Sequence, residues 1–121
     1  MSHVLDTIRE RRSVRKYLAR TVPQEAIEEV LVAAGWAPSA HNAQPWRFIV
    51  LADASVKREL AEAMAEPWAV DMAKDGITVD ADKRKARVER FANAPVLMLA
   101  CLTMDGMRKF PDEKRQKSER D

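Results

Sequence analysis

The chain has 121 residues, of which 46% are hydrophobic and 33% are charged, and its formal net charge is +2 at pH 7. This length suits one domain, and the apolar share is sufficient for a core, which argues against disorder throughout. The near balance of charge does not favour nucleic-acid binding, and a single cysteine with two histidines excludes an internal disulfide and a usual zinc site. No secretory pattern and no apolar run long enough to span a bilayer is visible. We therefore expect a cytoplasmic protein with no metal and no membrane partner.

Hydrophobic spacing predicts two helices in the first third of the chain. Apolar residues within Val4–Ile8 share one face of a helix expected from about residue 2 to residue 11. Apolar residues at i, i+3, i+4 and i+7 within Ile27–Ala34 predict the next helix. Thr21 and Gln24 have the spacing of a capping box at its start, and Gly35 is typical of its end.

The middle of the chain combines a loop, a strand and a helix. Residues 37–45 hold two prolines and several small polar side chains, which predicts a loop. The β-prone segment 46–51 predicts a strand. A further helix is expected to begin at Asp53 or Ser55 and to end at Pro67. Residues 68–79 carry mixed signals, which suggest a helix that breaks early.

A charged helix is expected over residues 80–93, with Val88, Phe91 and Ala92 facing inward. The continuous apolar run 95–103 favours a strand covered on both faces, although a buried helix segment has the same pattern. The last 17 residues, 105–121, contain 11 charged side chains. This composition favours an exposed helix or a charged C-terminal tail.

The first cluster of chemically useful side chains comprises Arg11, Arg12, Ser13 and Arg15. A guanidinium presents a planar fork of donors that matches phosphate oxygens, and a hydroxyl adds a neutral donor. A solvated basic surface explains the same residues, because charge runs are common on surfaces. With only 3 glycines, the chain has neither the dinucleotide fingerprint nor the P-loop, so any nucleotide would have to be held by side chains.

The second cluster lies in the predicted loop and comprises Ser39, His41, Asn42 and Gln44. Hydroxyl, imidazole and amide groups suit the hydrogen bonds of a sugar alcohol chain or a flavin ring edge. Turn chemistry explains them as well, because Asn and Ser often bond their own backbone. No acidic residue lies near His41 in sequence to orient it as a base, and Trp46 is expected to anchor the strand.

Together these two segments resemble the nitroreductase family. The family's typical opening is a helix, then R-R-S-x-R-x-[FY], then a helix that ends in A-P-S, then an N-x-Q-P-W turn that leads into a strand. This chain has Arg11–Tyr17, Ala37–Ser39 and Asn42–Phe48 in the same order and spacing. The resemblance covers roughly Val4 to Leu102 and is strong up to Leu51. It implies an α+β, nitroreductase-like fold with helices around a small central sheet, incomplete at the C-terminus.

The resemblance also implies a cofactor and a reaction. Family members are homodimers with FMN at the dimer interface, and they work by a ping-pong scheme. NAD(P)H reduces the flavin, and a small-molecule acceptor such as a nitroaromatic or a quinone leaves it oxidised. The flavin carries this chemistry, so no catalytic side chain is assigned. The implied FMN-binding residues are Arg11, Arg12, Ser13, Arg15, Pro38, Ser39, His41, Asn42 and Gln44.

Family domains continue beyond the length of this chain, with further helices, strands and basic residues of the phosphate site. We therefore expect residues 1–104 to form a partial nitroreductase-like FMN-binding domain, followed by a charged C-terminal tail over 105–121. A non-catalytic truncated remnant or a dimerisation module without flavin is the alternative. A nucleic-acid binder using the basic residues of 11–20 and 83–90 ranks last, because interleaved aromatic residues and a large positive charge are absent.

Overall fold

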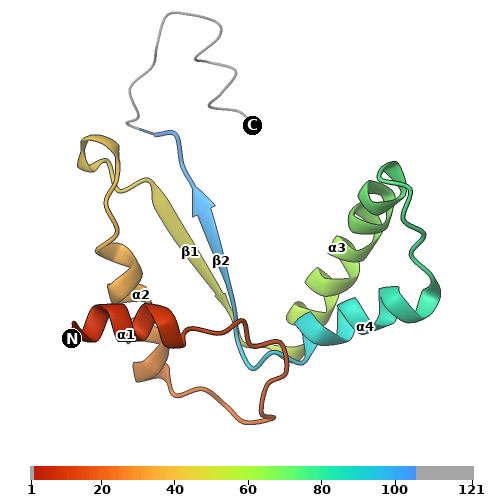
Figure 1. Cartoon of the computed structure of the whole chain (residues 1–121), viewed down its shortest axis with the longest axis horizontal. Coiled ribbons are helices and arrows are strands. Elements are labelled where there is room, and N and C mark those ends of the chain that lie inside the picture. Colours follow the sequence, from red (N-terminus) through yellow and green to blue (C-terminus); the bar gives the residue numbers. More distant parts are fainter. Residues whose placement is uncertain (1, 106–121) are drawn as a thin grey trace, which may run out of the picture. The chain divides into compact units, whose positions relative to one another are not determined.

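The computed structural model describes residues 2–105, and Figure 1 shows the helices and strands of this part of the chain. The chain divides into two compact units, one made of Met1–Val22 with Leu51–Leu97 and the other of Pro23–Val50 with Met98–Asp121. Helices and a two-stranded sheet occur together, so the predicted α+β class is confirmed.

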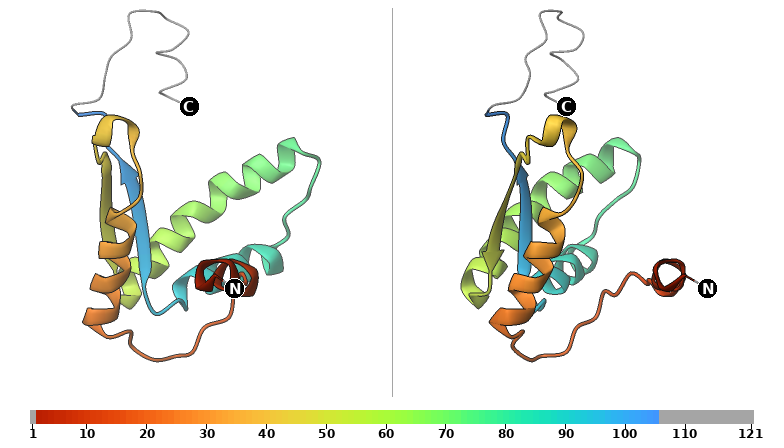
Figure 2. Two further views of the ribbon diagram at one scale, coloured as in Figure 1. Left: turned by 60° about the vertical axis from the view of Figure 1, so that its left-hand side comes forward. Right: turned by 90° about the vertical axis from the view of Figure 1, so that its left-hand side faces the viewer.

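The first unit contains α1 (His3–Glu10), α3 (Ala54–Lys74) and α4 (Ala81–Ala92). Helices α3 and α4 form a hairpin that is visible in Figures 1 and 2, and Gly76 in their connection has a φ of 74°, a value that glycine adopts without strain. Small side chains meet at the contact between the two helices. Ala61 and Ala65 of α3 form one buried cluster with Val88 and Ala92 of α4. The small size of alanine lets the two helix backbones approach closely. The buried cluster between them is the core of the unit.

Two aspartates begin these helices. Asp53 accepts hydrogen bonds from the backbone N–H groups of Ser55 (2.9 Å) and Val56 (3.0 Å), and Asp80 accepts one from the N–H of Lys83 (2.8 Å). The Ser55 hydroxyl also donates to Asp53, and this bond is the main reason why the pKa of Asp53 is lowered. Of the two starts predicted for this helix, Asp53 or Ser55, the structure has Asp53 as the N-cap and Ala54 as the first helical residue.

Two predictions about helix ends are wrong. Helix α3 continues through Pro67 as far as Lys74, because side chains on both sides of the proline are held by α4. Ala65 lies in the buried cluster, and Trp68 lies 4.5 Å from the Arg87 guanidinium. The capping box at Thr21 and Gln24 does not form, since α2 begins at Gln24 itself and Pro23 precedes it without a side-chain cap.

The second unit contains α2 (Gln24–Gly35), a 3₁₀ turn (Ala40–Asn42), and most of β1 (Trp46–Leu51) and β2 (Leu97–Leu102). The two strands are neighbours. Thr103, just after β2, donates its N–H to the carbonyl of Pro45, just before β1, at 2.8 Å, so the strands run antiparallel, as Figure 1 also shows. The predicted helix over 27–34 and the strand over 46–51 are confirmed.

Strand β2 differs from the expectation of a strand covered on both faces. Met98, Ala100, Cys101 and Leu102 are exposed, and within residues 2–105 β1 is the one strand paired with β2. The apolar run correctly indicates a strand, but its face with Met98, Ala100 and Leu102 is exposed, whereas Leu97 and Leu99 on the other face are partly buried. The predicted tail over 105–121 lies, except for Asp105, outside the described residues. Among the described helices, none has the length and apolar content to cross a membrane.

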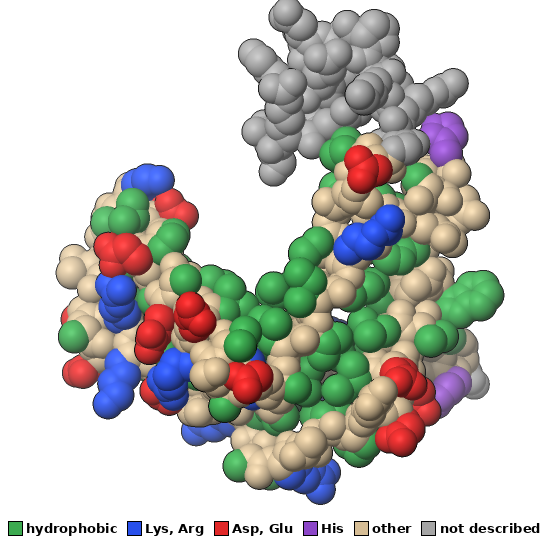
Figure 3. Space-filling view, turned by 180° about the vertical axis from the view of Figure 1, so that it is seen from behind, with side chains coloured by type: hydrophobic (Ala, Val, Ile, Leu, Met, Phe, Trp, Pro, Cys, Tyr) green, Lys and Arg blue, Asp and Glu red, His purple; other side chains and the backbone are tan. Residues whose placement is uncertain are grey.

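Apolar side chains are also exposed on two helices. Val4, Leu5 and Ile8 share the apolar face of α1, and each has at least half of its surface accessible. On α2 and at its end, Val30, Val32 and Trp36 are exposed, and Trp36 retains 84% of its accessible surface. Figure 3 shows hydrophobic side chains on the face that it displays. Apolar surface of this extent is typical of a face that another protein surface covers.

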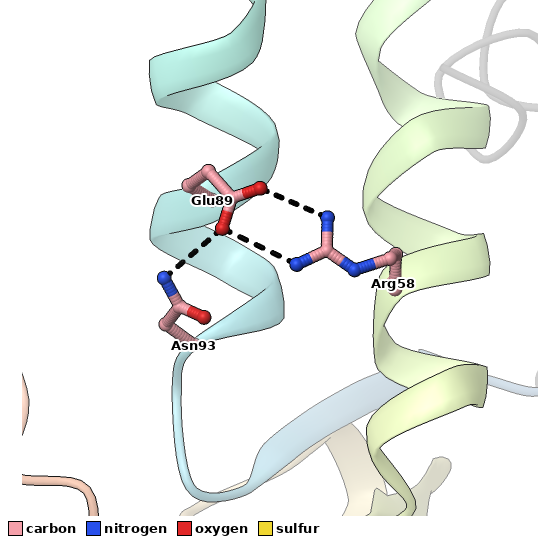
Figure 4. Close-up of polar contacts among 3 residues, drawn as sticks. All are labelled: Arg58, Glu89 and Asn93. Atoms are coloured by element: carbon pink, nitrogen blue, oxygen red, sulfur yellow. Dashed lines mark hydrogen bonds and ion pairs between the residues drawn. The ribbon is translucent and has the colours of Figure 1, made fainter.

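Helices α3 and α4 are also joined by an ion pair, shown in Figure 4. Arg58 donates from Nη1 and Nη2 to the two carboxylate oxygens of Glu89, at 2.9 and 3.2 Å, and Asn93 Nδ2 donates to the same carboxylate at 3.2 Å. The hydrogen bond from Arg58 is the main reason why the pKa of Glu89 is lowered. A bidentate arrangement of this kind adds orientation to the packing of the two helices.

Enlarging a buried alanine of the α3–α4 contact tests this packing. Ala65 is 0% exposed, so Ala65→Leu must displace α4 or strain a rotamer. We expect the free energy of unfolding to fall by about 1–3 kcal/mol, measured by denaturant titration. Ala63→Leu, the same change at an exposed position of α3, should leave it within about 0.5 kcal/mol. Equal losses in both variants would contradict the proposed contact.

The Arg58–Glu89 pair predicts a pH dependence. Because the folded pKa of Glu89 lies below its ordinary value of 4.5, the pair stabilises the fold above that value and loses its effect as the pH falls through the lower, folded pKa. In Arg58→Gln, the pKa of Glu89 should rise toward 4.5, which NMR titration of the Glu89 carboxyl would measure. Lys74→Gln, which removes the exposed Lys74–Asp71 pair of the same helix, should leave the Glu89 titration as it is. A wild-type Glu89 that titrates at its ordinary value would refute the pairing.

Candidate functional site

The segment that carries the first motif follows directly on α1. Arg11 leaves the helical conformation (φ −55°, ψ 132°), and its N–H still donates to the carbonyl of Thr7 at 3.2 Å. From Arg11 to Val22 the chain forms neither helix nor strand. The side chains of Arg11, Arg12 and Arg15 therefore project from an extended segment and not from one face of a helix.

These residues line a pocket of about 610 Å³. Arg11, Arg12, Ser13 and Arg15 all contribute to it, so the structure brings together the four residues predicted from the first motif. The other lining residues come from the same segment, from the end of α4, from the connection to β2 and from the first residue of β2, and all belong to the first unit. They are Val14, Tyr17, Val22, Arg90, Phe91, Ala94, Pro95, Val96 and Leu97.

The charge of this pocket has one sign. Arg11, Arg12, Arg15 and Arg90 line it, and no Asp or Glu is among its lining residues. Arg12 is partly engaged, because its Nη1 donates to the carbonyls of Arg9 (2.8 Å) and Arg11 (2.9 Å). Within residues 2–105, the guanidiniums of Arg11, Arg15 and Arg90 donate no hydrogen bond to a protein acceptor. Their donors are available to an anion, and Ser13 adds a hydroxyl to the same lining.

A buried lysine holds one side of the pocket. Lys57 of α3 is 6% exposed, and its Nζ donates to the carbonyl oxygens of Ala94 (2.6 Å) and Pro95 (3.1 Å). Both residues line the pocket, so Lys57 orients the backbone of the wall. Removing the ammonium would leave two carbonyls without this donor. In the sequence Lys57 is indistinguishable from the solvated lysines of a helix surface.

Arg90 and Phe91 are pocket residues that sequence reasoning did not assign to the site. The Arg90 guanidinium lies 5.1 Å from the centroid of the Phe91 ring, a distance typical of a cation–π contact. In the sequence, Arg90 belongs to the basic stretch 83–90, and Phe91 is predicted to face the core. No local pattern indicates that the end of α4 meets the segment after α1, because this contact joins distant parts of the chain.

The second motif forms a tight turn in the second unit. His41, Asn42 and Gln44 have φ values of 53°, 52° and 47°, in the left-handed region that side-chain-bearing residues seldom occupy. The turn is closed by the Asn42 N–H, which donates to the carbonyl of Ser39, and by the Gln44 N–H, which donates to Ser39 Oγ, both at 3.0 Å. Ser39 therefore has the turn role that its residue type also predicted.

The remaining predicted side chains of this loop point to water. Pro38, His41, Asn42 and Gln44 are exposed, and in the described part of the chain the side chains of His41, Asn42 and Gln44 form no hydrogen bond. Strained backbone with unpaired polar groups is typical of a ligand-contacting turn. The first motif belongs to one unit and this turn to the other, so their convergence on one ligand stays a prediction. No group of three or more His, Cys, Asp or Glu residues capable of holding a metal ion occurs among the described residues.

The sequence of this chain matches a known protein family. Residues 8–121 match the nitroreductase family. A protein of Archaeoglobus fulgidus with the provisional name NADH dehydrogenase/NAD(P)H nitroreductase is 39% identical over 87 residues, which cover 72% of this chain and 50% of that protein.

Two solved structures have a similar fold. A nitroreductase with bound FMN from Bacteroides fragilis matches with a TM-score of 0.60 and 25% identity, covering 83% of this chain and 52% of its own. Oxidised iodotyrosine deiodinase bound to FMN and 3-iodo-L-tyrosine matches with a TM-score of 0.59 and 26% identity, covering 80% of this chain and 55% of its own.

The present chain spans about half the length of the archaeal relative and of these two structures. The family match nevertheless extends over nearly all of its residues and includes the basic segment that lines the pocket. The chain belongs to the nitroreductase family.

Proposed function

We propose that this chain supplies the phosphate-binding side of an FMN-dependent oxidoreductase that passes electrons from NAD(P)H to a nitroaromatic, a quinone or a similar conjugated acceptor. The observation that carries the proposal is the pocket of about 610 Å³, which four arginines and Ser13 line without any carboxylate. Such a lining suits a dianionic phosphate monoester, because planar guanidiniums bind phosphate oxygens through paired hydrogen bonds.

The donor set of the pocket fits the anionic end of FMN. Arg11 and Arg15 have unengaged guanidiniums in the described part of the chain, whereas Arg12 already bonds two backbone carbonyls. Arg11, Arg15 and Ser13 are therefore the proposed phosphate ligands, and Arg12 contributes mainly charge. Each charged hydrogen bond of this kind contributes about 1.5–3 kcal/mol. When bound, FMN supplies reversible two-electron chemistry, so the protein's tasks are binding and orientation.

The turn of the second unit is the proposed contact for the flavin ring. Exposed donors and acceptors on His41, Asn42 and Gln44, carried on left-handed backbone, support this assignment.

The exposed apolar face of α1, formed by Val4, Leu5 and Ile8, supports a homodimer, in which a second copy would cover such a surface. A cytoplasmic location stays a prediction from the sequence.

The names of the relatives support the donor and the acceptor class. The archaeal relative is named for NADH and NAD(P)H chemistry, and one matching structure contains 3-iodo-L-tyrosine. Nitroaromatics and quinones are the primary acceptors to test, with 3-iodo-L-tyrosine as the second. Oxidation of NADH and of NADPH in the presence of FMN would be followed at the nicotinamide absorbance band, separately with each acceptor.

Flavin binding is the direct test of the pocket. Adding the protein to FMN should quench flavin fluorescence, and riboflavin should bind at least about 10-fold more weakly, because it lacks the phosphate. In Arg11→Ala/Arg15→Ala, the dissociation constant of FMN should rise by about 100-fold or more, toward that of riboflavin, if the two charged contacts add.

A matched double variant controls for the loss of two charges. Lys83→Ala/Lys85→Ala removes the same charge from α4 at positions outside the pocket lining and should leave the dissociation constant of FMN within about threefold of wild type. Unchanged FMN affinity in the arginine variant would remove Arg11 and Arg15 from the site. A colourless wild-type protein that does not quench FMN would favour the alternative of a non-catalytic dimerisation module.

A further inference from the structure

Arg90 lies where two neighbouring pockets share residues. Besides the pocket described above, the first unit contains one of about 530 Å³ lined by Arg15, Lys16, Tyr17, Ala86, Glu89, Arg90 and Asn93. Arg15, Tyr17 and Arg90 belong to both linings. Arg90 is thus the α4 cation that stands beside the basic segment following α1.

The side chain of Arg90 is the last member of a stack of alternating rings and guanidiniums. Arg87 lies 4.5 Å from the centroid of Trp68 and 5.2 Å from that of Phe91, and Arg90 lies 5.1 Å from that of Phe91. Trp68 comes from α3 and the other three residues from α4. Phe91 packs against the buried alanine cluster, so the ring beside the Arg90 guanidinium is supported by the core.

Arg87 and Arg90 flank the Phe91 ring, and within residues 2–105 neither guanidinium forms an ion pair or a hydrogen bond with a protein acceptor. Burial, and secondarily the charge of Arg90, lowers the pKa of Arg87. Arg87 Nε is buried and has no hydrogen-bond partner within the described residues. Glu89, the carboxylate beside Arg90, is engaged by Arg58 and Asn93. An anion beside Arg90 would therefore offset the repulsion between Arg90 and Arg87.

We propose that Arg90 is a phosphate ligand of this pocket, acting together with Arg11 and Arg15, and that the Trp68–Arg87–Phe91 stack is the device that positions it. The part of this inference that identifies the phosphate as that of FMN rests on the proposed function. The competing role for Arg90 is structural, because a cation in the last turn of a helix stabilises the helix C-terminus. Free phosphate and flavin phosphate present the same chemistry, and the two arms of the test separate them.

The first arm compares FMN with riboflavin. In Arg90→Gln, the dissociation constant of FMN should rise by about 10- to 100-fold, while that of riboflavin should stay within about threefold. Lys83→Gln removes one charge from α4 two helical turns earlier, outside both pockets, and should change neither constant by more than about threefold. Equal FMN affinity in wild type and Arg90→Gln would overturn the proposal.

The second arm uses inorganic phosphate and needs no flavin. The melting temperature of wild type should be higher in phosphate than in chloride at equal ionic strength, and this difference should shrink by at least half in Arg90→Gln and persist in Lys83→Gln. A purely structural Arg90 would lower the melting temperature equally in both salts, which would overturn the proposal. A phosphate effect that depends on Arg90, in a wild-type protein that does not bind FMN, would support Arg90 as an anion ligand and refute the proposed flavin function. No phosphate effect and no FMN binding in wild type would overturn both.

Discussion

The close contact of α3 and α4 through alanines is the interaction on which the rest of the first unit depends. Ala61 and Ala65 of α3 leave room for Val88 and Ala92 of α4. The resulting distance between the two helices is the distance across which their side chains form ion pairs and ring contacts. The Arg58–Glu89 ion pair and the Arg87–Trp68 contact both join the same two helices. A larger residue in the cluster would therefore disturb charges as well as packing, because both kinds of contact share one interhelical distance.

Local pattern predicted the elements whose hydrophobic spacing is regular. The period within Ile27–Ala34 predicted α2, and the β-prone run predicted β1. The pattern failed at Pro67, where propensity argues for an end but the contacts of Ala65 and Trp68 with α4 outweigh the missing hydrogen bond. It also failed for the faces of β2, since an apolar run shows that a strand can be covered but does not show which element covers it.

The lining of the pocket was predictable only where its residues are neighbours in the sequence. Arg11, Arg12, Ser13 and Arg15 stand together in the sequence, and the structure gathers them in one pocket. Arg90 reaches the same pocket from α4, and Lys57 of α3 holds the backbone of its wall through the carbonyls of Ala94 and Pro95. No sequence spacing distinguishes either residue from surface cations. No pattern in the sequence indicates that, within the described residues, Arg12 is hydrogen-bonded while Arg15 is not. The carbonyls of Arg9 and Arg11, which accept from Arg12, lack a partner within the helix because they lie at the C-terminal end of α1.

The turn at His41, Asn42 and Gln44 has a consequence for recognition. Left-handed φ angles at residues with side chains are unfavourable in free energy. Here the conformation is already present in the folded protein, where Ser39 accepts hydrogen bonds from the N–H groups of Asn42 and Gln44. A flat ligand arriving at this turn would meet a backbone that is already ordered. Its association would then lose less conformational entropy than contact with an unstructured loop, so even modest hydrogen bonds from the exposed side chains would translate into affinity.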